Sequence, residues 1–225
     1  MTDFIFSEDE VNMISASLDK GHGSWKDDCL KELKSRIKEH LKVRQDHVCC
    51  YCLRNLHGEF NFVIDIEHIL PKHRYKEFMF TLDNLAASCK RCNMKMKGRR
   101  IDFITEKFEN HSNPFASENY FFIHPNSDHF EKHIEFIHTQ IGRKIAIFYN
   151  VINNSPKGLF NYDFFRLDQL VKNSFDRAQG IEVENEDFYE GDPEDDDIND
   201  DDDEHTKSIS IEDEIAFLAR NNNQI

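Results

Sequence analysis

The chain has 225 residues, enough for one or two domains with a hydrophobic core, and its 20 phenylalanines supply ample apolar surface to bury. It contains no run of the roughly 18 to 20 apolar residues that a membrane span needs, and its acidic start, MTDFIFSEDEVN, lacks the layout of a signal peptide. These features predict a cytoplasmic protein whose six cysteines are free thiols or metal ligands rather than disulfides.

The net charge of −15 is unevenly distributed along the chain. Residues 181–204 hold fifteen acidic side chains and no Lys or Arg, and subtracting fifteen from 43 leaves 28 acids against 28 bases elsewhere. Residues 70–100 hold nine bases and two acids, a local charge of +7 that suits phosphate groups. The local charge therefore favours a nucleic-acid partner, although the charge of the whole chain argues against one.

Residues 1–46 are predicted to form an N-terminal helical segment. Between Trp25 and Leu41, apolar residues recur at steps of three and four, which predicts an amphipathic helix. These residues are Leu30, Leu33, Ile37 and Leu41. Ser24 stands where a serine would cap that helix.

Residues 47–100 are irregular and punctuated by cysteines, as expected for a small unit stapled by a metal ion. Within it, FNFVIDI (60–66) is expected to be a strand, and the segment from Cys89 to Arg100 a helix.

Residues 101–180 are rich in aromatic side chains and are predicted to form a second subdomain packed on the first. The stretch NYFFIHPNSDHFEKHIEFIH (119–138) is expected to combine a short strand with a helix, and KIAIFYNV (144–151) to be a strand. SPKG (155–158) is expected to be a turn, and LFNYDFFRLDQLVKNSF (159–175) a helix.

Two further segments are predicted after this subdomain. Residues 181–206 are expected to be an acidic disordered linker, because they cannot bury enough apolar surface to fold. Residues 207–225 carry Ile211, Ile215 and Leu218 at helical spacing, which predicts a short amphipathic peptide that docks either in cis or onto a partner.

Four cysteines at two-residue spacing predict a metal site. The two C-x-x-C pairs, separated by 36 residues, are Cys49 with Cys52 and Cys89 with Cys92. Two such turns complete a tetrahedral Zn²⁺ site, and their pairing in a charged, irregular segment favours structural zinc over redox chemistry. Cys50 is in the wrong register and Cys29 stands alone, so both are predicted to be plain thiols. A closed site of four thiolates leaves no position for a substrate, so any catalysis requires other residues.

The segments between and after these cysteines resemble the HNH endonuclease family, the treble-clef or ββα-metal nucleases. The resemblance is carried by the four cysteines, IEHILPK (66–72), DNLAASCKRCN (83–93) and KMKG (95–98), in the family's order and spacing. It covers roughly a quarter of the chain. It implies an α+β fold: a zinc-stapled ββα-metal (HNH) core at residues 47–100, with an N-terminal helical lead-in and a C-terminal α+β subdomain at residues 101–180.

The resemblance also implies catalytic roles. Hydrolysis of a phosphodiester needs a nucleophilic water, a base and positive charge near the leaving oxygen. His68 is the expected base, because a neutral imidazole can accept a proton near pH 7. Asn84 is expected to orient the imidazole or the backbone around it. Glu67 and Asn93 are expected to supply oxygen ligands for one Mg²⁺ or Mn²⁺ ion on the scissile phosphate, separate from the zinc.

Because of two departures from the family pattern, the sequence does not decide which carboxylate binds the catalytic ion. Asn93 stands at the third motif position in place of histidine, a variant that the family includes. Glu67 precedes His68 where Asp is commoner, and Asp65 on the same face of the strand is the alternative ligand. A single histidine such as His68 is more often structural. Its position between the two cysteine pairs predicted to bind zinc is what favours a nuclease site.

Several other polar residues are compatible with either a functional or a purely structural role. The expected nucleic-acid-binding residues are Lys72, Arg74, Lys95, Lys97, Arg99 and Arg100, although such a run is often only a solvated face. His73 is equally compatible with a phosphate contact and with a solvated side chain. His129 and His133 are spaced one helical turn apart, but no carboxylate or cysteine pattern completes a metal site. Together with His124 and His138 they are interpreted as surface or packing histidines.

The layout is also similar to the nuclease subunits of bacterial anti-phage systems, namely Septu-type and retron-associated HNH proteins. The similarity lies in the wide spacing of the cysteine pairs, the helical lead-in with Trp25 and the segment HPNSD (124–128). It implies DNA as substrate and an ATPase subunit as partner. The acidic linker and terminal peptide would then dock on a partner, or occupy the basic face at rest, because a tethered polyanion competes with phosphate.

Two other functions stay open on the sequence. One is a catalytically silent zinc module that binds nucleic acid or protein. The other is an interaction protein whose acidic tail mimics DNA. Metal-dependent nicking of DNA that requires His68 distinguishes a nuclease from the silent module.

Overall fold

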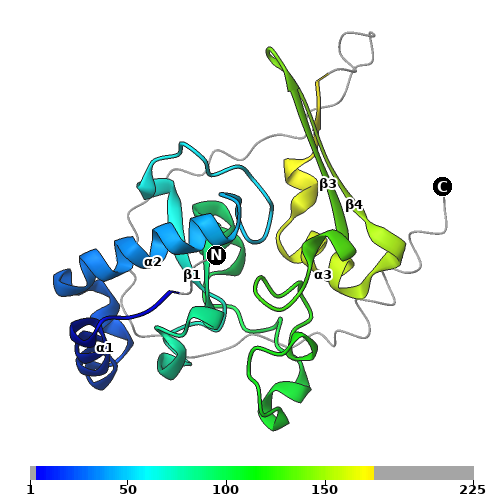
Figure 1. The fold of residues 1–225 in the computed structure, drawn as a ribbon. Coiled ribbons are helices and arrows are strands. Elements are labelled where there is room, and N and C mark those ends of the chain that lie inside the picture. Colours follow the sequence, from blue (N-terminus) through cyan, green and yellow to red (C-terminus); the bar gives the residue numbers. More distant parts are fainter. Residues whose placement is uncertain (1–3, 175–225) are drawn as a thin grey trace. The chain divides into compact units, whose positions relative to one another are not determined.

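The computed structural model of the protein describes residues 4–174, which lie within one compact unit. The linker and peptide predicted for residues 181–225 lie outside the described residues. In chain order, the elements are α1 (Glu8–Lys20), α2 (Lys31–Arg44), β1 (Ile64–His68), β2 (Leu85–Cys89), a π-helix (Arg91–Lys97), β3 (Ile134–Ile141), β4 (Lys144–Val151), α3 (Pro156–Phe164) and β5 (Lys172–Asn173), joined by loops and short 3-10 turns (Figure 1). Within the described range, none of the helices is long and apolar enough to cross a membrane.

The N-terminal segment begins with a well-capped helix. The Ser7 side chain accepts a hydrogen bond from the Glu10 amide, and the Glu10 carboxylate accepts one from the Ser7 amide, forming a capping box. The same carboxylate pairs with Arg36 of α2, so the cap of α1 also joins the two helices.

The predicted helix between Trp25 and Leu41 is present but begins later than expected. Helix α2 starts at Lys31, and its apolar stripe is buried as predicted. Ser24 does not cap it, which corrects the sequence prediction. The Ser24 side chain lies in a 3-10 turn and donates to the Gly21 and Ser17 carbonyls, so it ties this turn back to α1.

The core of residues 47–100 is built on a two-stranded antiparallel sheet. Strand β1 pairs with β2 from Ile64↔Cys89 to His68↔Leu85, and α2 packs against both strands. Every residue of β2 is buried. The strand predicted at 60–66 begins only at Ile64, because residues 61–63 form a 3-10 turn.

The helix predicted between Cys89 and Arg100 is a π-helix. The Gly98 amide donates to the Asn93 carbonyl five residues earlier (2.8 Å), as π geometry requires. Gly98 has a φ of +51°, a conformation that glycine adopts without strain, and it ends the helix after Lys97. Cys89 belongs to β2 rather than to the helix.

In the second subdomain, the helix predicted within 119–138 is wrong. Residues from Ile134 onward form β3, which pairs with β4 over all eight residues of each strand, from Ile134↔Val151 to Ile141↔Lys144. The two strands form a long hairpin (Figure 1). The prediction of a strand at 144–151 is confirmed. The apolar residues in 130–137 have helical spacing, but the hydrogen-bonded pairing with β4 stabilises the strand instead.

The predicted turn SPKG is the first turn of α3. The Ser155 side chain accepts from the Gly158 amide (3.2 Å), and Pro156 occupies the first helical position, where no amide donor is required. A Cβ at Gly158 would lie 2.6 Å from the His133 carbonyl oxygen, so only glycine fits this contact. The helix ends at Phe164, well before residue 175, because Arg166 adopts a left-handed conformation.

The aromatic subdomain contacts the turn that carries the first two cysteines. The Tyr51 ring stacks on Phe165 with ring centroids 4.2 Å apart. The Tyr149 hydroxyl donates to the Cys52 carbonyl (2.7 Å), and the Asn161 amide donates to the Tyr51 carbonyl (3.3 Å). The conformation of the cysteine turn is therefore supported by both parts of the described chain.

Candidate functional site

The four cysteines predicted to bind zinc lie together. The Sγ atoms of Cys49, Cys52, Cys89 and Cys92 all lie within 4.8 Å of one another, and all four residues are buried. The Cys52 and Cys89 sulfurs are 3.9 Å apart, close to the distance of about 3.8 Å across a tetrahedron with Zn–S bonds of about 2.3 Å. The cluster could hold a zinc ion, and it includes neither Cys50 nor Cys29.

His68 is the last residue of β1 and lies beneath the N-terminal segment. Its Nε2 is 3.1 Å from the Met79 carbonyl, and this pairing places the proton on Nε2 and leaves the lone pair on Nδ1. The His68 and Trp25 rings pack in a T-shaped arrangement with their centroids 4.5 Å apart. Burial, with the positive charges of Lys72 and Lys97, lowers the pKa of His68 to about 3, so the imidazole is neutral at physiological pH.

Asn84 contacts the backbone around His68 rather than its ring. The Asn84 Oδ1 accepts from the Leu70 amide (2.7 Å), and its Nδ2 donates to the carbonyls of Leu70 and Phe78 (3.1 Å each). These bonds fix the loop between β1 and β2 immediately before Met79, whose carbonyl meets the imidazole. Asn84 was expected to orient either the imidazole or the backbone around it, and its hydrogen bonds are those of the second role.

The two candidate carboxylates of β1 have different partners. Asp65 Oδ2 accepts from the Asn93 side chain (2.9 Å), and Asp65 Oδ1 lies 3.2 Å from the Lys90 ammonium. Glu67 is 2.7 Å from the Lys97 ammonium and accepts from the Tyr51 hydroxyl (3.0 Å). The structure therefore brings Asp65, and not Glu67, to Asn93.

Lys97 lies in the core rather than on the basic surface where the sequence placed it. The side chains of Lys97 and Glu67 are each 1% exposed. The Lys97 ammonium also donates to the His68 carbonyl (2.9 Å) and lies 5.4 Å from the Phe103 ring centroid. Lys97 thus joins the carboxylate before His68 to the backbone of His68 itself.

The other predicted nucleic-acid-binding residues differ in their surroundings. Arg74, Lys95 and Arg99 are exposed, whereas Lys72 is half-buried and its pKa is lowered mainly by that burial. The Arg100 guanidinium pairs with Asp102 and lies 3.8 Å from the Phe164 ring centroid. His73 is exposed, and partial burial with the charge of Arg99 lowers its pKa.

The four histidines of the second subdomain do not form a metal pair. His129 and His133 flank a 3-10 turn instead of facing each other on an α-helix, and His133 Nδ1 lies 2.6 Å from the Ser155 hydroxyl. His138 is exposed on β3. His124 is fully buried, and its Nδ1 accepts from the amides of residues 126 and 127.

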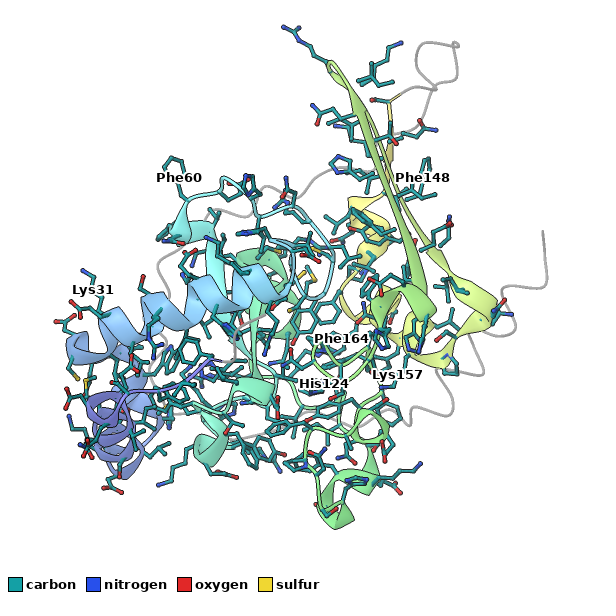
Figure 2. All side chains as sticks on the ribbon, in the orientation of Figure 1. Lys31, Phe60, His124, Phe148, Lys157 and Phe164 are labelled. Carbon is teal, nitrogen blue, oxygen red and sulfur yellow. The ribbon has the colours of Figure 1, made fainter. Side chains whose placement is uncertain are left out.

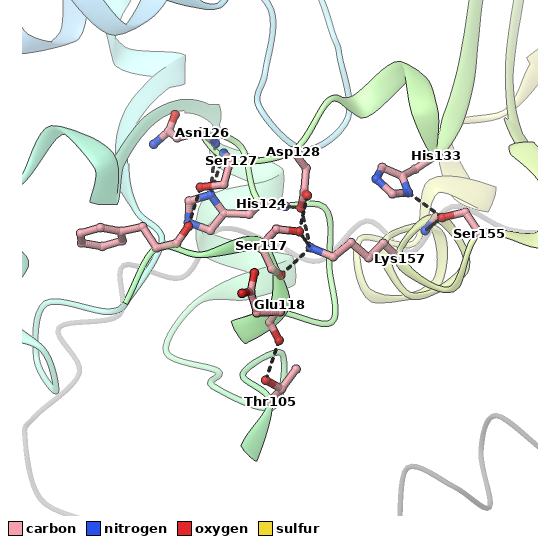
Figure 3. A network of polar contacts seen from close by, with 12 residues as sticks. Thr105, Ser117, Glu118, His124, Asn126, Ser127, Asp128, His133, Ser155 and Lys157 are labelled. Carbon is pink, nitrogen blue, oxygen red and sulfur yellow. Dashed lines mark hydrogen bonds and ion pairs between the residues drawn. The ribbon is translucent and has the colours of Figure 1, made fainter. Parts of the chain in front are cut away.

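The HPNSD segment around His124 is held by a polar network (Figure 3). Asp128 pairs with the Lys157 ammonium and accepts from the Ser117 hydroxyl and the His124 amide. Asn126 accepts from Arg44 of α2 (2.8 Å) and donates to the carbonyls of residues 83 and 85. The segment therefore joins the aromatic subdomain to the start of β2, next to Asn84.

The buried His124 predicts a specific loss of stability in acid. Burial lowers the pKa of His124 to about 3, against 6.5 ordinarily, so between these values the unfolded chain binds a proton that the folded chain excludes. The free energy of unfolding should therefore fall by about 1.4 kcal/mol per pH unit below pH 6.5 from this residue alone. Urea unfolding between pH 7.5 and 5.5 should show a shallower slope for His124→Asn, which retains an acceptor near Nδ1. Identical slopes for the two proteins would contradict this assignment.

Comparison with known proteins adds three findings. Residues 49–99 match the family model of the HNH endonucleases, a range that includes all four cysteines. The chain is also 32% identical over 87 residues to the Septu protein PtuB of Bacillus thuringiensis. This match covers 39% of the chain and 31% of the relative, so the chain spans about a third of the length of the relative that it matches. No solved structure matches.

Proposed function

We propose that the protein is a metal-dependent endonuclease that hydrolyses phosphodiester bonds of DNA, a proposal supported by the match of residues 49–99 to the HNH endonuclease family model. The observation that carries the proposal is the environment of His68. A neutral imidazole, with one nitrogen anchored on the Met79 carbonyl, stands at the end of a strand that is fixed by the four-cysteine cluster. Nδ1 of His68 accepts the proton of the attacking water, and the anchored Nε2 keeps the ring oriented.

Asp65 and Asn93 are the residues that would hold a catalytic Mg²⁺ or Mn²⁺ ion. The Asn93 Nδ2 lies 2.9 Å from Asp65 Oδ2, which places the two side chains together. The Asp65 carboxylate and the Asn93 Oδ1 are oxygen ligands of the kind that such ions prefer. When bound, the ion supplies positive charge to the scissile phosphate. Glu67 is the alternative ligand, and it would first have to leave Lys97. The four cysteines hold a separate structural Zn²⁺.

The biological setting follows from the similarity to the Septu protein PtuB. We propose that the protein acts in the cytoplasm as the nuclease of an anti-phage defence complex with an ATPase subunit. The four clustered cysteines suit a reducing compartment, where paired C-x-x-C motifs are more often metal ligands than disulfides. Copurification of an ATPase subunit with the tagged chain from its native host tests the partnership.

The decisive test of the nuclease is substitution of the proposed base. Purified protein with Mg²⁺ or Mn²⁺ should nick plasmid DNA, and His68→Ala should lower the rate by about 10²- to 10⁴-fold, the usual contribution of a general base. The matched control is His138→Ala, which removes an exposed histidine of β3. Both variants should retain zinc. Equal nicking by His68→Ala and the wild type would refute the assignment.

One observation favours a second function, a catalytically silent zinc module that binds nucleic acid. The Glu67 carboxylate, in the position where the family holds its metal, is neutralised by a buried lysine. The same assay separates the two functions. A silent module binds DNA without nicking it under any metal tested.

A further inference from the structure

The loop before β1 exposes two phenylalanine side chains. Phe60 is 83% exposed and Phe62 is 79% exposed, and Figure 2 shows the Phe60 ring projecting from its loop. Most large apolar side chains gain free energy by burial, and two exposed rings at alternate positions forgo that gain. Both residues belong to one short segment, and exposed apolar side chains grouped on one part of a surface commonly mark a binding surface.

This loop is held in place. The Lys38 ammonium from α2 donates to the carbonyls of Asn61 (3.0 Å) and Ile64 (2.6 Å), on either side of Phe62. The Val63 amide donates to the Phe60 carbonyl (3.0 Å) and closes a 3-10 turn. The two rings are therefore carried on a fixed turn at the start of β1.

The rings are connected to the candidate ion site by direct contacts. The Lys90 ammonium lies 4.7 Å from the Phe62 ring centroid, and the same ammonium lies 3.2 Å from Asp65. Asp65 in turn accepts from Asn93. Met94, next to Asn93, is 65% exposed and its sulfur lies 3.9 Å from the Lys90 ammonium. Phe62 and the candidate ion site therefore share Lys90 as a neighbour, so a molecule on the Phe62 ring would lie near an ion held by Asp65 and Asn93 and near the phosphate that such an ion binds.

We propose that Phe60 and Phe62 form a platform on which unpaired bases of the nucleic-acid substrate stack, beside the scissile phosphate. The inference rests on the proposed nuclease function and specifies its substrate: single-stranded, melted or otherwise unpaired nucleotides. Every base has a flat apolar face that stacks on an aromatic ring, and every nucleotide carries a phosphate. The Phe62 ring beside the Lys90 ammonium matches both features. Phe and Met are also enriched in protein interfaces, but Lys is depleted there, so the Lys90 ammonium against the Phe62 ring favours a nucleic-acid partner.

The platform also predicts how DNA is engaged. A base inside an intact duplex is not free to stack on a side chain, so the rings contact only bases that have left the helix. Binding should therefore be stronger for a single strand or a bubbled duplex than for a fully paired duplex of the same length and charge.

The test measures binding without cleavage, in the His68→Ala background and without divalent metal. The probe is an oligothymidylate strand with one 2-aminopurine base, whose fluorescence falls when it stacks. Phe60→Ala and Phe62→Ala should each weaken binding by about 5- to 150-fold and remove the fluorescence change. Phe62→Trp should retain both. The control is Ile141→Ala, which removes an apolar side chain of β3 that is 67% exposed, and it should bind like the parent.

Other outcomes overturn the inference. Unchanged affinity and fluorescence in both alanine variants would show that the rings do not touch bases. Normal oligonucleotide binding together with loss of self-association, or loss of a copurifying protein, would assign the rings to a protein interface instead. Because cleavage is not measured, loss of the nuclease proposal leaves this test intact: a wild type that binds through the rings but never nicks DNA refutes only the nuclease.

Discussion

Replacing Cys89 with serine is expected to abolish the proposed zinc binding and to unfold residues 47–100. Structural zinc contributes about 10 to 16 kcal/mol at neutral pH, which matches or exceeds the usual total stability of a domain of about 5 to 15 kcal/mol. The loss should extend to the aromatic subdomain, because Tyr149 and Asn161 donate hydrogen bonds to the carbonyls of the cysteine turn. Zinc content by atomic absorption and thermal unfolding by circular dichroism measure both effects.

The control for this experiment is another cysteine of the same chain. Cys29 is exposed and lies outside the four-sulfur cluster, so Cys29→Ser should retain one zinc ion and the wild-type unfolding midpoint. Removal of zinc from the wild type by a chelator should reproduce the Cys89→Ser result. A Cys89→Ser protein with full zinc and an unchanged midpoint would exclude the proposed ligand set.

Replacing Lys97 with methionine is expected to cost about 3 to 5 kcal/mol of folding free energy at pH 7.5, because Glu67 is left buried without its counter-charge. Burial already raises the pKa of Glu67, and the Lys97 charge with the Tyr51 hydrogen bond opposes that rise. In Lys97→Met the pKa of Glu67 should rise further. A carboxyl with a raised pKa binds a proton in the folded state first, so the contribution of Glu67 to stability rises as the pH falls, and the deficit of the variant relative to the wild type shrinks. Urea unfolding should show a smaller deficit at pH 5.5 than at pH 7.5.

Two comparisons isolate the ion pair from the lysine itself. Lys95→Met removes an exposed lysine two residues away and should change stability by no more than about 0.5 kcal/mol. The double variant Glu67→Gln/Lys97→Met removes both charges and should be more stable than Lys97→Met alone. If the double variant were no more stable than Lys97→Met, the lost folding free energy would come from lost packing and not from an unpaired charge.

The parts of the site that could be predicted from the sequence depend on local spacing. A C-x-x-C turn directs two sulfurs to one point, and the register that excludes Cys50 can be read directly from the chain. The helical stripe that ends at Leu41 was predictable for the same reason, because a periodic pattern reports which face is buried. The start of that helix was not predictable, because the Ser24 hydroxyl donates a hydrogen bond to the Ser17 carbonyl of α1 instead of capping α2.

The other features depend on partners distant in the sequence. Phe130, Ile134 and Ile137 have helical spacing, and only pairing with β4 makes this region a hairpin. A run of lysines does not reveal which one turns inward, so Lys97 was placed on the surface. Tyr51 was missed altogether, because a tyrosine between two cysteines has no pattern that indicates a hydrogen bond to Glu67.

The π-helix has a consequence for how this segment can change during evolution. Its wider turn accommodates one residue more than an α-helix would between Asn93 and the closing Gly98. In an α-helix the residue that donates to the Asn93 carbonyl is the fourth one along the chain, and here it is the fifth. Deleting one residue between Asn93 and Gly98 would therefore be absorbed by a change from π to α geometry, with the glycine still closing the segment. Related chains that are one residue shorter here should keep the closing glycine and the lysine before it.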